Sequence, residues 1–275
     1  MKALFSLSYL RIFMSAVLAT VFLLLAGCSG QEKDPVLKVG VMAGPEADLM
    51  QVAIKQLKKN TGIKAKLVEF SDYVAPNMAL TDGSIDVNAF QHRPYLDSMI
   101  KERGLKLAVV GNTFLYPIGA YSKKIKNIAE LKHGAIIAIP NDPSNEGRTL
   151  MLLDHEGLIT LKDSHDLEAT PADIIKNPKD LHFKELDAAQ LPRSLDDVDL
   201  AFINSTYAVP AGLLPSRDAL LLEGSKSAYV NLIVSREDNK TDPRIIALVH
   251  AYHSEAVKKK AEELFHGSAI PGWQG

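Results

Sequence analysis

The stretch VLKVGVMAGPEADLMQVAIKQLKKNTGIKAKLVEF, residues 36–70, combines a β-rich run, an amphipathic helical run and a second β-rich run. The aliphatic runs at its two ends are typical of strands, and Leu49, Ala53 and Leu57 between them recur at the spacing of one helix face. Strands that alternate with helices favour βαβ units and a mostly parallel sheet covered by helices. The stretch therefore predicts an α/β fold.

The alternation of strand and helix patterns continues along the chain and falls into two cycles. The first cycle includes a predicted strand at 84–90, and the second begins with a predicted strand at 135–140. A predicted helix from Pro243, after the capping residue Asp242, to about Phe265 ends the pattern. A folded chain of this length typically divides into units of about 100 to 150 residues. We therefore expect two α/β lobes.

Two segments with an extended pattern, 114–122 and 228–237, lie between the cycles. We expect them to be the crossovers that join the lobes at a hinge. Since the chain would cross twice, the first lobe would be completed by C-terminal residues. The predicted lobes are residues 36–113 together with 238–275, and residues 123–227.

Residues 1–27 have the pattern of a signal peptide. Lys2 and Arg11 precede an apolar run that ends at Gly27 and is shorter than the about 20 apolar residues of a membrane-spanning helix. Cys28, the only cysteine of the sequence, follows directly, and the letters LAGC resemble the bacterial lipobox. That resemblance implies removal of the leader and acylation of Cys28. The alternative is an ordinary signal peptide followed by an incidental cysteine.

The polar segment 28–35 predicts a short tether between lipid and fold. Two or more acyl chains on Cys28 would hold the protein at a membrane lipid surface. The next residue is Ser29 rather than aspartate, which by the enteric sorting rule favours the outer membrane. We expect a protein that is anchored to the cell envelope and faces the periplasm, with the inner membrane as the alternative.

The mature chain is weakly acidic. The sequence has 31 Lys and Arg and 33 Asp and Glu, so removal of Lys2 and Arg11 leaves 29 against 33, a formal charge of −4. Nucleic-acid binding, which depends on a basic surface, is therefore not expected. The sequence also lacks a G-x-S-x-G elbow, a P-loop and an H-E-x-x-H motif, and the histidine pair His250 and His253 has no evident third ligand. We expect no catalysis, no metal site and no cofactor.

The segment NAFQHRP, residues 88–94, places aromatic side chains after a predicted strand. Ligands of open α/β sheets bind beyond the carboxyl ends of the strands. Phe90 and His92 alternate along an extended path, because the residue before Pro94 avoids the helical conformation, so they would project to the same side. They could form one wall of a ligand site. The alternative is a core phenylalanine and a capping or exposed histidine.

A second candidate lies in IPNDPSNEGR, residues 139–148, where a predicted strand ends and a helix begins near Ser144 or Asn145. Free N–H groups and the helix dipole favour an anion at such a start. Arg148, in the first turn, could bind a carboxylate through two N–H groups. The alternative is a capped surface helix whose Arg148 is solvated, with Glu146 as its nearest counter-charge.

Two asparagines, Asn204 and Asn231, occupy comparable positions in β-like runs. An asparagine side chain offers both a donor and an acceptor, which suits a zwitterion whose ammonium needs acceptors and whose carboxylate needs donors. The alternative is a turn or capping role. It fits Asn204 better than Asn231, because Asn231 stands inside an apolar run.

Seven motifs between Val36 and Trp273 carry a resemblance to a known family. They are NAFQHRPYL, VGNTF, YSKKIK, IPNDPSNEGR, ELDAAQLPRSLDD, YVNLIVSREDNK and a terminal PGW. They resemble the MetQ/NlpA family of methionine-binding lipoproteins, the substrate-binding components of methionine ABC transporters. The resemblance implies a two-lobed type II periplasmic-binding-protein fold with a ligand cleft between the lobes, which close about a hinge.

The resemblance also implies a binding site. In the family, three ring side chains enclose the ligand thioether and three polar side chains hold the amino-acid head group. The matching positions here are Tyr73, Phe90 and His92 for the thioether, and Arg148, Asn204 and Asn231 for the head group. Sulfur favours aromatic neighbours, which fits methionine. Glu146 departs from the apolar residue usual in relatives, and a carboxylate facing the cleft would change the ligand preference.

The function that the resemblance implies is capture of methionine, as the L or D form or a close derivative. The protein would deliver this ligand to an inner-membrane ABC permease and its ATPase, would act as a monomer and would catalyse nothing. The rival hypothesis is a structural or antigenic outer-membrane surface lipoprotein of the same fold that is not coupled to transport.

Overall fold

The computed structural model of the chain describes residues 36–225 and 227–273. The predicted signal peptide, the tether and the acylated Cys28 lie outside the described residues. Within the described part, none of the helices combines the length and the apolar character needed to cross a membrane.

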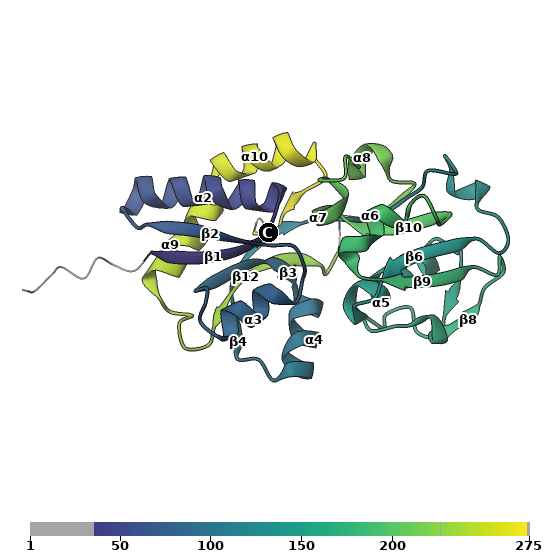
Figure 1. Cartoon of the computed structure of the whole chain (residues 1–275), viewed down its shortest axis with the longest axis horizontal. Coiled ribbons are helices and arrows are strands. Elements are labelled where there is room, and N and C mark those ends of the chain that lie inside the picture. Colours follow the sequence, from purple (N-terminus) through teal and green to yellow (C-terminus); the bar gives the residue numbers. More distant parts are fainter. Residues whose placement is uncertain (1–35, 226, 274–275) are drawn as a thin grey trace, which may run out of the picture. The chain divides into compact units, whose positions relative to one another are not determined.

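The larger of the two main sheets has six strands. They are β1 (Leu37–Met42), β2 (Ala65–Phe70), β3 (Val87–His92), β4 (Leu107–Leu115), β12 (Val230–Arg236) and β13 (Ile270–Pro271). Their order is β13-β4-β12-β3-β1-β2 (Figure 1). Strand β1 is parallel to β2 and β3, whereas β12 is antiparallel to β3 and β4, and β13 is antiparallel to β4.

Helices cover both faces of the larger sheet. They are α2 (Pro45–Thr61), α3 (Ala75–Thr81), α4 (Arg93–Arg103), α9 (Pro243–Tyr252) and α10 (Glu255–Phe265). One apolar cluster joins α2, α9 and α10 to the sheet, and a second joins α3 and α4 to its opposite face. The predicted face of α2 is confirmed, since Leu49, Ala53 and Leu57 are fully buried. Pro45 starts this helix, and Gly62 ends it in the left-handed region with φ 76°.

The smaller main sheet has five strands. They are β5 (Ile118–Tyr121), β6 (Ile136–Pro140), β9 (His182–Leu186), β10 (Leu200–Asn204) and β11 (Leu221–Leu222), in the order β11-β5-β10-β6-β9. Strand β6 is parallel to β9 and β10, and β5 is antiparallel to β10 and β11. A separate pair, β7 (Thr160–Leu161) and β8 (Ile174–Lys176), is antiparallel.

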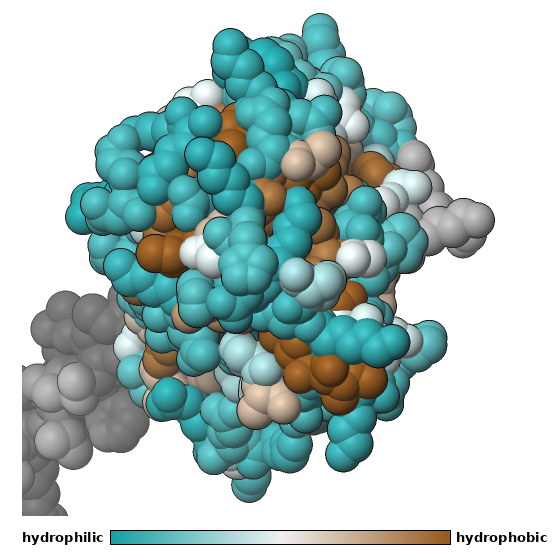
Figure 2. Space-filling model, turned by 90° about the vertical axis from the view of Figure 1, so that its right-hand side faces the viewer, coloured by the Kyte–Doolittle hydropathy of each residue, from teal (hydrophilic) through white to brown (hydrophobic). Residues whose placement is uncertain are grey.

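Short helices and one longer helix surround the smaller sheet. The α-helices are α5 (Pro143–His155), α6 (Leu191–Ser194), α7 (Ser205–Ala208) and α8 (Pro215–Asp218), and the 3₁₀ turns are η1 (Ile128–Glu130), η2 (Pro171–Asp173) and η3 (Ala188–Gln190). Two apolar clusters fill the two faces of this sheet. The end of the molecule that carries it is mostly hydrophilic, and its apolar side chains form separate groups (Figure 2).

The prediction of an α/β fold is confirmed, but the prediction of mostly parallel sheets is wrong. Strands β5, β11, β12 and β13 each pair antiparallel with their neighbours. The parallel pair β1–β2 comes from one strand–helix–strand unit, which the sequence pattern displays locally. The antiparallel pairs join segments far apart in the chain, which no local pattern reports.

The segments predicted as crossovers are extended, and each contributes a strand. Residues 118–121 form β5 of the smaller sheet, and residues 230–236 form β12, an inner strand of the larger sheet. The single helix predicted from Pro243 to Phe265 is instead two helices, because the chain leaves the helical conformation at Ser254, with φ −80° and ψ 155°.

Candidate functional site

One cavity is lined by residues from the elements of both main sheets. All six residues predicted for the site line it, namely Tyr73, Phe90, His92, Arg148, Asn204 and Asn231. The other lining residues are Gln91, Tyr95, Tyr116, Asn145, Ser205 and Thr206. The structure thus brings together side chains that are up to 158 positions apart (231 − 73) in the sequence.

Aromatic rings form one side of the cavity. The Tyr73 ring lies 6.1 Å from that of Phe90 and 5.9 Å from that of Tyr95, measured between centroids. The Tyr95 hydroxyl donates to the Tyr73 carbonyl at 2.9 Å, which fixes the loop before α3 against the start of α4. Phe90 is 3% exposed. The rings are therefore held rigidly, and their faces and edges offer a polarizable, apolar surface.

His92 combines both roles that the sequence left open for it. It caps α4, because its Nδ1 atom accepts from the Tyr95 N–H at 3.2 Å, and it also lines the cavity. Burial, and then the nearby Arg148, lower the pKa of His92 to about 3. The ring is therefore neutral at physiological pH. Since Nδ1 is an acceptor, the proton lies on Nε2, which is 3.2 Å from Oδ1 of Asn145.

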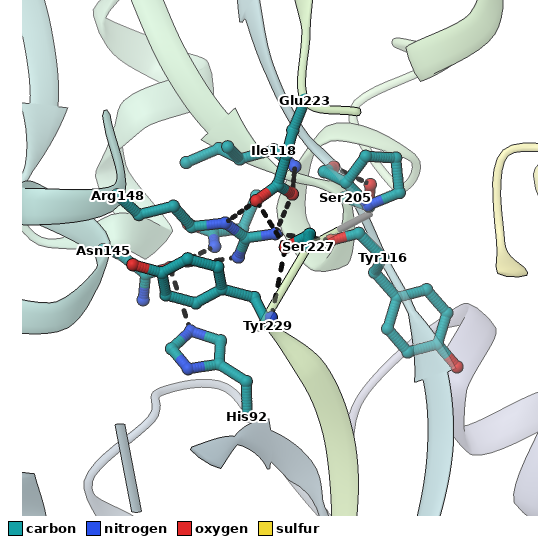
Figure 3. A network of polar contacts seen from close by, with 11 residues as sticks. His92, Tyr116, Ile118, Asn145, Arg148, Ser205, Glu223, Ser227 and Tyr229 are labelled. Atoms are coloured by element: carbon teal, nitrogen blue, oxygen red, sulfur yellow. Dashed lines mark hydrogen bonds and ion pairs between the residues drawn. The ribbon is translucent and has the colours of Figure 1, made fainter. Parts of the chain in front are cut away.

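Arg148 is buried and paired with Glu223, a residue that sequence analysis missed. The Arg148 Nε atom donates to Glu223 Oε1 at 2.9 Å, and Nη2 donates to Oε2 and, at 3.1 Å, to the Tyr116 carbonyl. The guanidinium carbon also lies 4.4 Å from the ring centroid of Tyr229 (Figure 3). The alternative of a solvated Arg148 is therefore wrong. Nε and Nη2 are engaged, and Nη1 directs one hydrogen at Asn145 Oδ1 at 3.4 Å, so the second Nη1 hydrogen remains for a ligand anion.

The Glu223 carboxylate accepts hydrogen bonds from two groups besides Arg148. Ser227 donates its hydroxyl at 2.8 Å and Ile118 donates its backbone N–H at 3.3 Å. Figure 3 shows these groups around the ion pair: Ile118 is the first residue of β5, and Ser227 precedes β12. The ion pair is thereby joined to the segment 114–122 that was predicted as a crossover, and the Tyr229 ring beside the guanidinium lies in the other predicted segment, 228–237. Glu223 is 75 residues from Arg148 in the chain, so no local sequence signal could reveal the pair.

Asn145 lines the cavity, and its side chain was not predicted for the site. Its Nδ2 atom donates to both carboxylate oxygens of Asp142, and its Oδ1 atom faces His92, Arg148 and Asn204. Asp142 also caps α5 through the Asn145 backbone N–H at 3.0 Å. Burial raises the pKa of Asp142, and these hydrogen bonds oppose that rise.

The two asparagines predicted for the head group lie at different places around the cavity. Asn204 ends β10, and its Nδ2 atom donates to Oδ1 of Asn145 at 2.9 Å. Asn231 lies in β12, and its Nδ2 atom donates to the Phe90 carbonyl at 2.9 Å, so it also joins β12 to β3. Both side chains are more than nine-tenths buried.

Two buried glutamates lie close to the site without lining the cavity. Burial, followed by the charges of Glu185 and Asp142, raises the pKa of Glu146 to about 7, and its side chain is not part of the cavity wall. Glu46, in α2, accepts from the Thr206 hydroxyl of α7 at 2.5 Å, and burial raises its pKa to about 8. The Glu46–Thr206 contact therefore joins elements that pack on different main sheets.

Comparison with known proteins gives consistent matches over nearly all of the described chain. The family model described as NlpA lipoprotein matches residues 37–273. A D-methionine-binding lipoprotein MetQ from Salmonella typhi is 54% identical over 254 residues, which cover 91% of this chain and 94% of that protein. Outer membrane lipoprotein 2 of Mannheimia haemolytica is 51% identical over 242 residues and 88% of each chain.

Solved structures agree with the sequence matches. A nutrient-binding protein from Burkholderia cenocepacia, whose structure contains bound methionine, superposes with a TM-score of 0.84 at 49% identity. The match covers 86% of this chain and 100% of the other. This agreement over the whole described part confirms the fold expected from the resemblance.

Proposed function

Because the chain belongs to the NlpA lipoprotein family, we propose that it captures methionine, as the L or D form or a close derivative, and delivers it to an ABC importer. The observation that carries the proposal is a single cavity that combines an aromatic side with a buried arginine. This combination suits an amino acid with an apolar, sulfur-containing side chain. The proposal makes the protein a binding protein and not an enzyme.

The ligand would lie with its two ends in different surroundings. The thioether would contact the rings of Tyr73, Phe90 and His92, and each sulfur–aromatic contact is worth about 0.3 to 1.5 kcal/mol. The carboxylate would bind Nη1 of Arg148, whose other N–H groups are engaged. Because the lining residues come from elements of both main sheets, ligand binding would hold the two predicted lobes closed.

The proposal includes an envelope location and two protein partners. Acylation of Cys28 would anchor the chain to a membrane lipid surface facing the periplasm. An inner-membrane permease would receive the ligand, and its ATPase subunits would supply the energy. The protein would act as a monomer at that surface.

Calorimetric titration of the mature chain with L-methionine, D-methionine and norleucine tests the proposed ligand. Norleucine has a similar shape but a methylene in place of sulfur. We expect tight binding of one or both methionine enantiomers and weaker binding of norleucine. Absence of binding of both enantiomers, to protein freed of copurified ligand by refolding, would refute the proposed function.

The name of the Mannheimia haemolytica relative and Ser29 favour a second candidate, an outer-membrane surface lipoprotein that is not coupled to transport. The two functions differ in location and in the effect of deletion. Membrane fractionation and methionine uptake in a deletion strain distinguish them. Outer-membrane residence with normal uptake would favour the surface lipoprotein, and reduced uptake would favour the importer component.

A further inference from the structure

The side-chain amide of Asn145 has an orientation that Asp142 fixes. Its Nδ2 atom lies 3.0 Å from each of the two Asp142 carboxylate oxygens. A carboxylate only accepts hydrogen bonds, so the nitrogen of the amide and not its oxygen must face Asp142. The Oδ1 atom of Asn145 therefore points the other way, toward the residues that line the cavity.

Donors converge on that Oδ1 atom. Asn204 Nδ2 lies at 2.9 Å, His92 Nε2 at 3.2 Å and Arg148 Nη1 at 3.4 Å. The histidine is a donor here because its Nδ1 atom already accepts from the Tyr95 N–H. The oxygen of Asn145 is therefore the common acceptor of all three donors. Three of the six residues predicted for the site thus share one acceptor on a residue that was not predicted.

The orientation of Asn145 determines which atom Asn204 can offer to a ligand. Because the Asn204 nitrogen is held by Asn145, its Oδ1 atom is turned away from that contact. Among residues 36–225 and 227–273, no group donates to this buried oxygen, although Asn204 is only 7% exposed and lines the cavity. A buried acceptor without a donor is energetically unfavourable, so a ligand whose N–H group donates to this oxygen gains binding free energy. A ligand carboxylate has no hydrogen to donate, whereas an ammonium has three.

The side-chain amide of Asn231 is oriented in the same way as that of Asn204, with its nitrogen held by the protein. Its Nδ2 atom donates to the Phe90 carbonyl, so its oxygen is the atom free to face a ligand donor. The two asparagines then both present acceptors, and the carboxylate is left to Arg148.

We propose that Asn145, held by Asp142, is a positioning residue that turns the Asn204 amide so that its Oδ1 atom accepts from the α-ammonium of the ligand. This inference rests on the proposed function, since it takes the ligand to be an amino acid of the methionine type. It adds a requirement on the ligand class. The ligand must carry an N–H donor on Cα, and the corresponding acid without an amino group binds poorly.

The variant Asn145→Ala tests the positioning role with two ligands, L-methionine and 4-(methylthio)butanoate. The second ligand keeps the carboxylate and the thioether and lacks only the ammonium. The helix cap is retained in the variant, because Asp142 accepts from the backbone N–H of position 145. Asn141→Ala is the matched control, since Asn141 is an exposed neighbour in the same loop. Calorimetry, with competition against methionine for the weaker ligand, gives all the affinities, and circular dichroism checks the fold.

In the wild type, we expect methionine to bind about 10- to 100-fold more tightly than 4-(methylthio)butanoate. In Asn145→Ala, the Asn204 amide is free to turn, so methionine loses about tenfold or more and this ratio falls. Affinity for 4-(methylthio)butanoate stays within about threefold, because Glu223 and the Tyr116 carbonyl still hold Arg148 and the Tyr95 N–H still holds His92. Asn141→Ala keeps both wild-type affinities.

An equal loss for both ligands would show a merely structural role and overturn the inference while leaving the proposed function in place. An unchanged methionine affinity in Asn145→Ala would overturn it too, as would a wild type that binds the two ligands equally. A wild type that binds methionine in neither form would refute the proposed function, and the inference with it.

Discussion

The Arg148–Glu223 pair allows the stability of the protein to be separated from its ligand binding. The two side chains are 3% and 11% exposed, so neither charge is well solvated. We consider Arg148→Met, which removes the cation and keeps the apolar stem, and the double variant with Glu223→Gln. Both variants remove the group proposed to bind the ligand carboxylate. They differ in whether a buried charge is left behind.

The single substitution leaves the Glu223 carboxylate with only Ser227 and the Ile118 N–H as donors among the contacts described. Loss of one partner of a buried ion pair typically costs about 3 to 5 kcal/mol of unfolding free energy. In the double variant the remaining side chain is neutral and can still accept from the same two donors. Replacement of both charges is often close to neutral, so we expect a net loss of about 1 to 2 kcal/mol.

Urea unfolding and calorimetry measure the two effects independently. With a urea dependence of about 1 to 3 kcal/mol per molar, Arg148→Met should lower the midpoint by about 1 M or more, and the double variant should recover most of that. Methionine affinity should fall by about 10- to 150-fold in both variants, because a hydrogen bond to a charged group is lost. A double variant as unstable as Arg148→Met would refute the reasoning about the buried charge. Retained affinity in either variant would refute the role of Arg148.

Three further predictions, one of them with a matched control substitution, have defined outcomes. Glu46→Gln should be more stable than the wild type at high pH. The pKa of the Glu46 carboxyl is about 8 in the native protein and about 4.3 in the unfolded chain. The wild type therefore loses stability as the pH rises between these two values, whereas a glutamine does not titrate. Thermal unfolding at pH 5 and 8.5 measures the difference between the proteins, and a difference independent of pH would contradict it. Gly147→Ala should destabilise the protein by about 1 to 3 kcal/mol, because a Cβ atom would lie 2.4 Å from the Leu167 carbonyl oxygen, whereas Gly224→Ala has open space and should be neutral in urea unfolding. Equal midpoints for the two glycine variants would show that the close approach is absent. Tyr73→Leu should reduce the preference for methionine over norleucine in calorimetry, since a sulfur–aromatic contact of about 0.3 to 1.5 kcal/mol is lost. An unchanged preference would place the sulfur elsewhere.

The parts of the fold that the sequence predicted are those with a local signal. Leu49, Ala53 and Leu57 mark the buried face of α2 because helix periodicity repeats within a few residues. The antiparallel position of β12 between β3 and β4 was not predicted, because the pattern of a strand identifies neither its distant partner nor the direction of the pairing. The break at Ser254 was missed because the apolar pattern runs on across it.

For the candidate site, the sequence predicted the individual residues but not the contacts between them. Residue type and position identified Phe90, His92, Arg148 and the two asparagines as candidates, and the family resemblance added Tyr73. Their partners were not predictable, because Glu223 and Asn145 act through contacts that only the fold brings about. The concern that Glu146 faces the ligand disappears once the cavity wall is known, since that side chain is not part of it.

The most direct test of the central claim is the position of the ligand sulfur in the cavity. A crystal of the mature protein, expressed with ordinary methionine and grown with L-selenomethionine as the ligand, locates selenium by its anomalous signal. We predict one selenium peak between the rings of Tyr73, Phe90 and His92, with the ligand carboxylate against Arg148. A peak outside this cavity, or a ligand in the reverse orientation with selenium beside Arg148, would contradict this prediction.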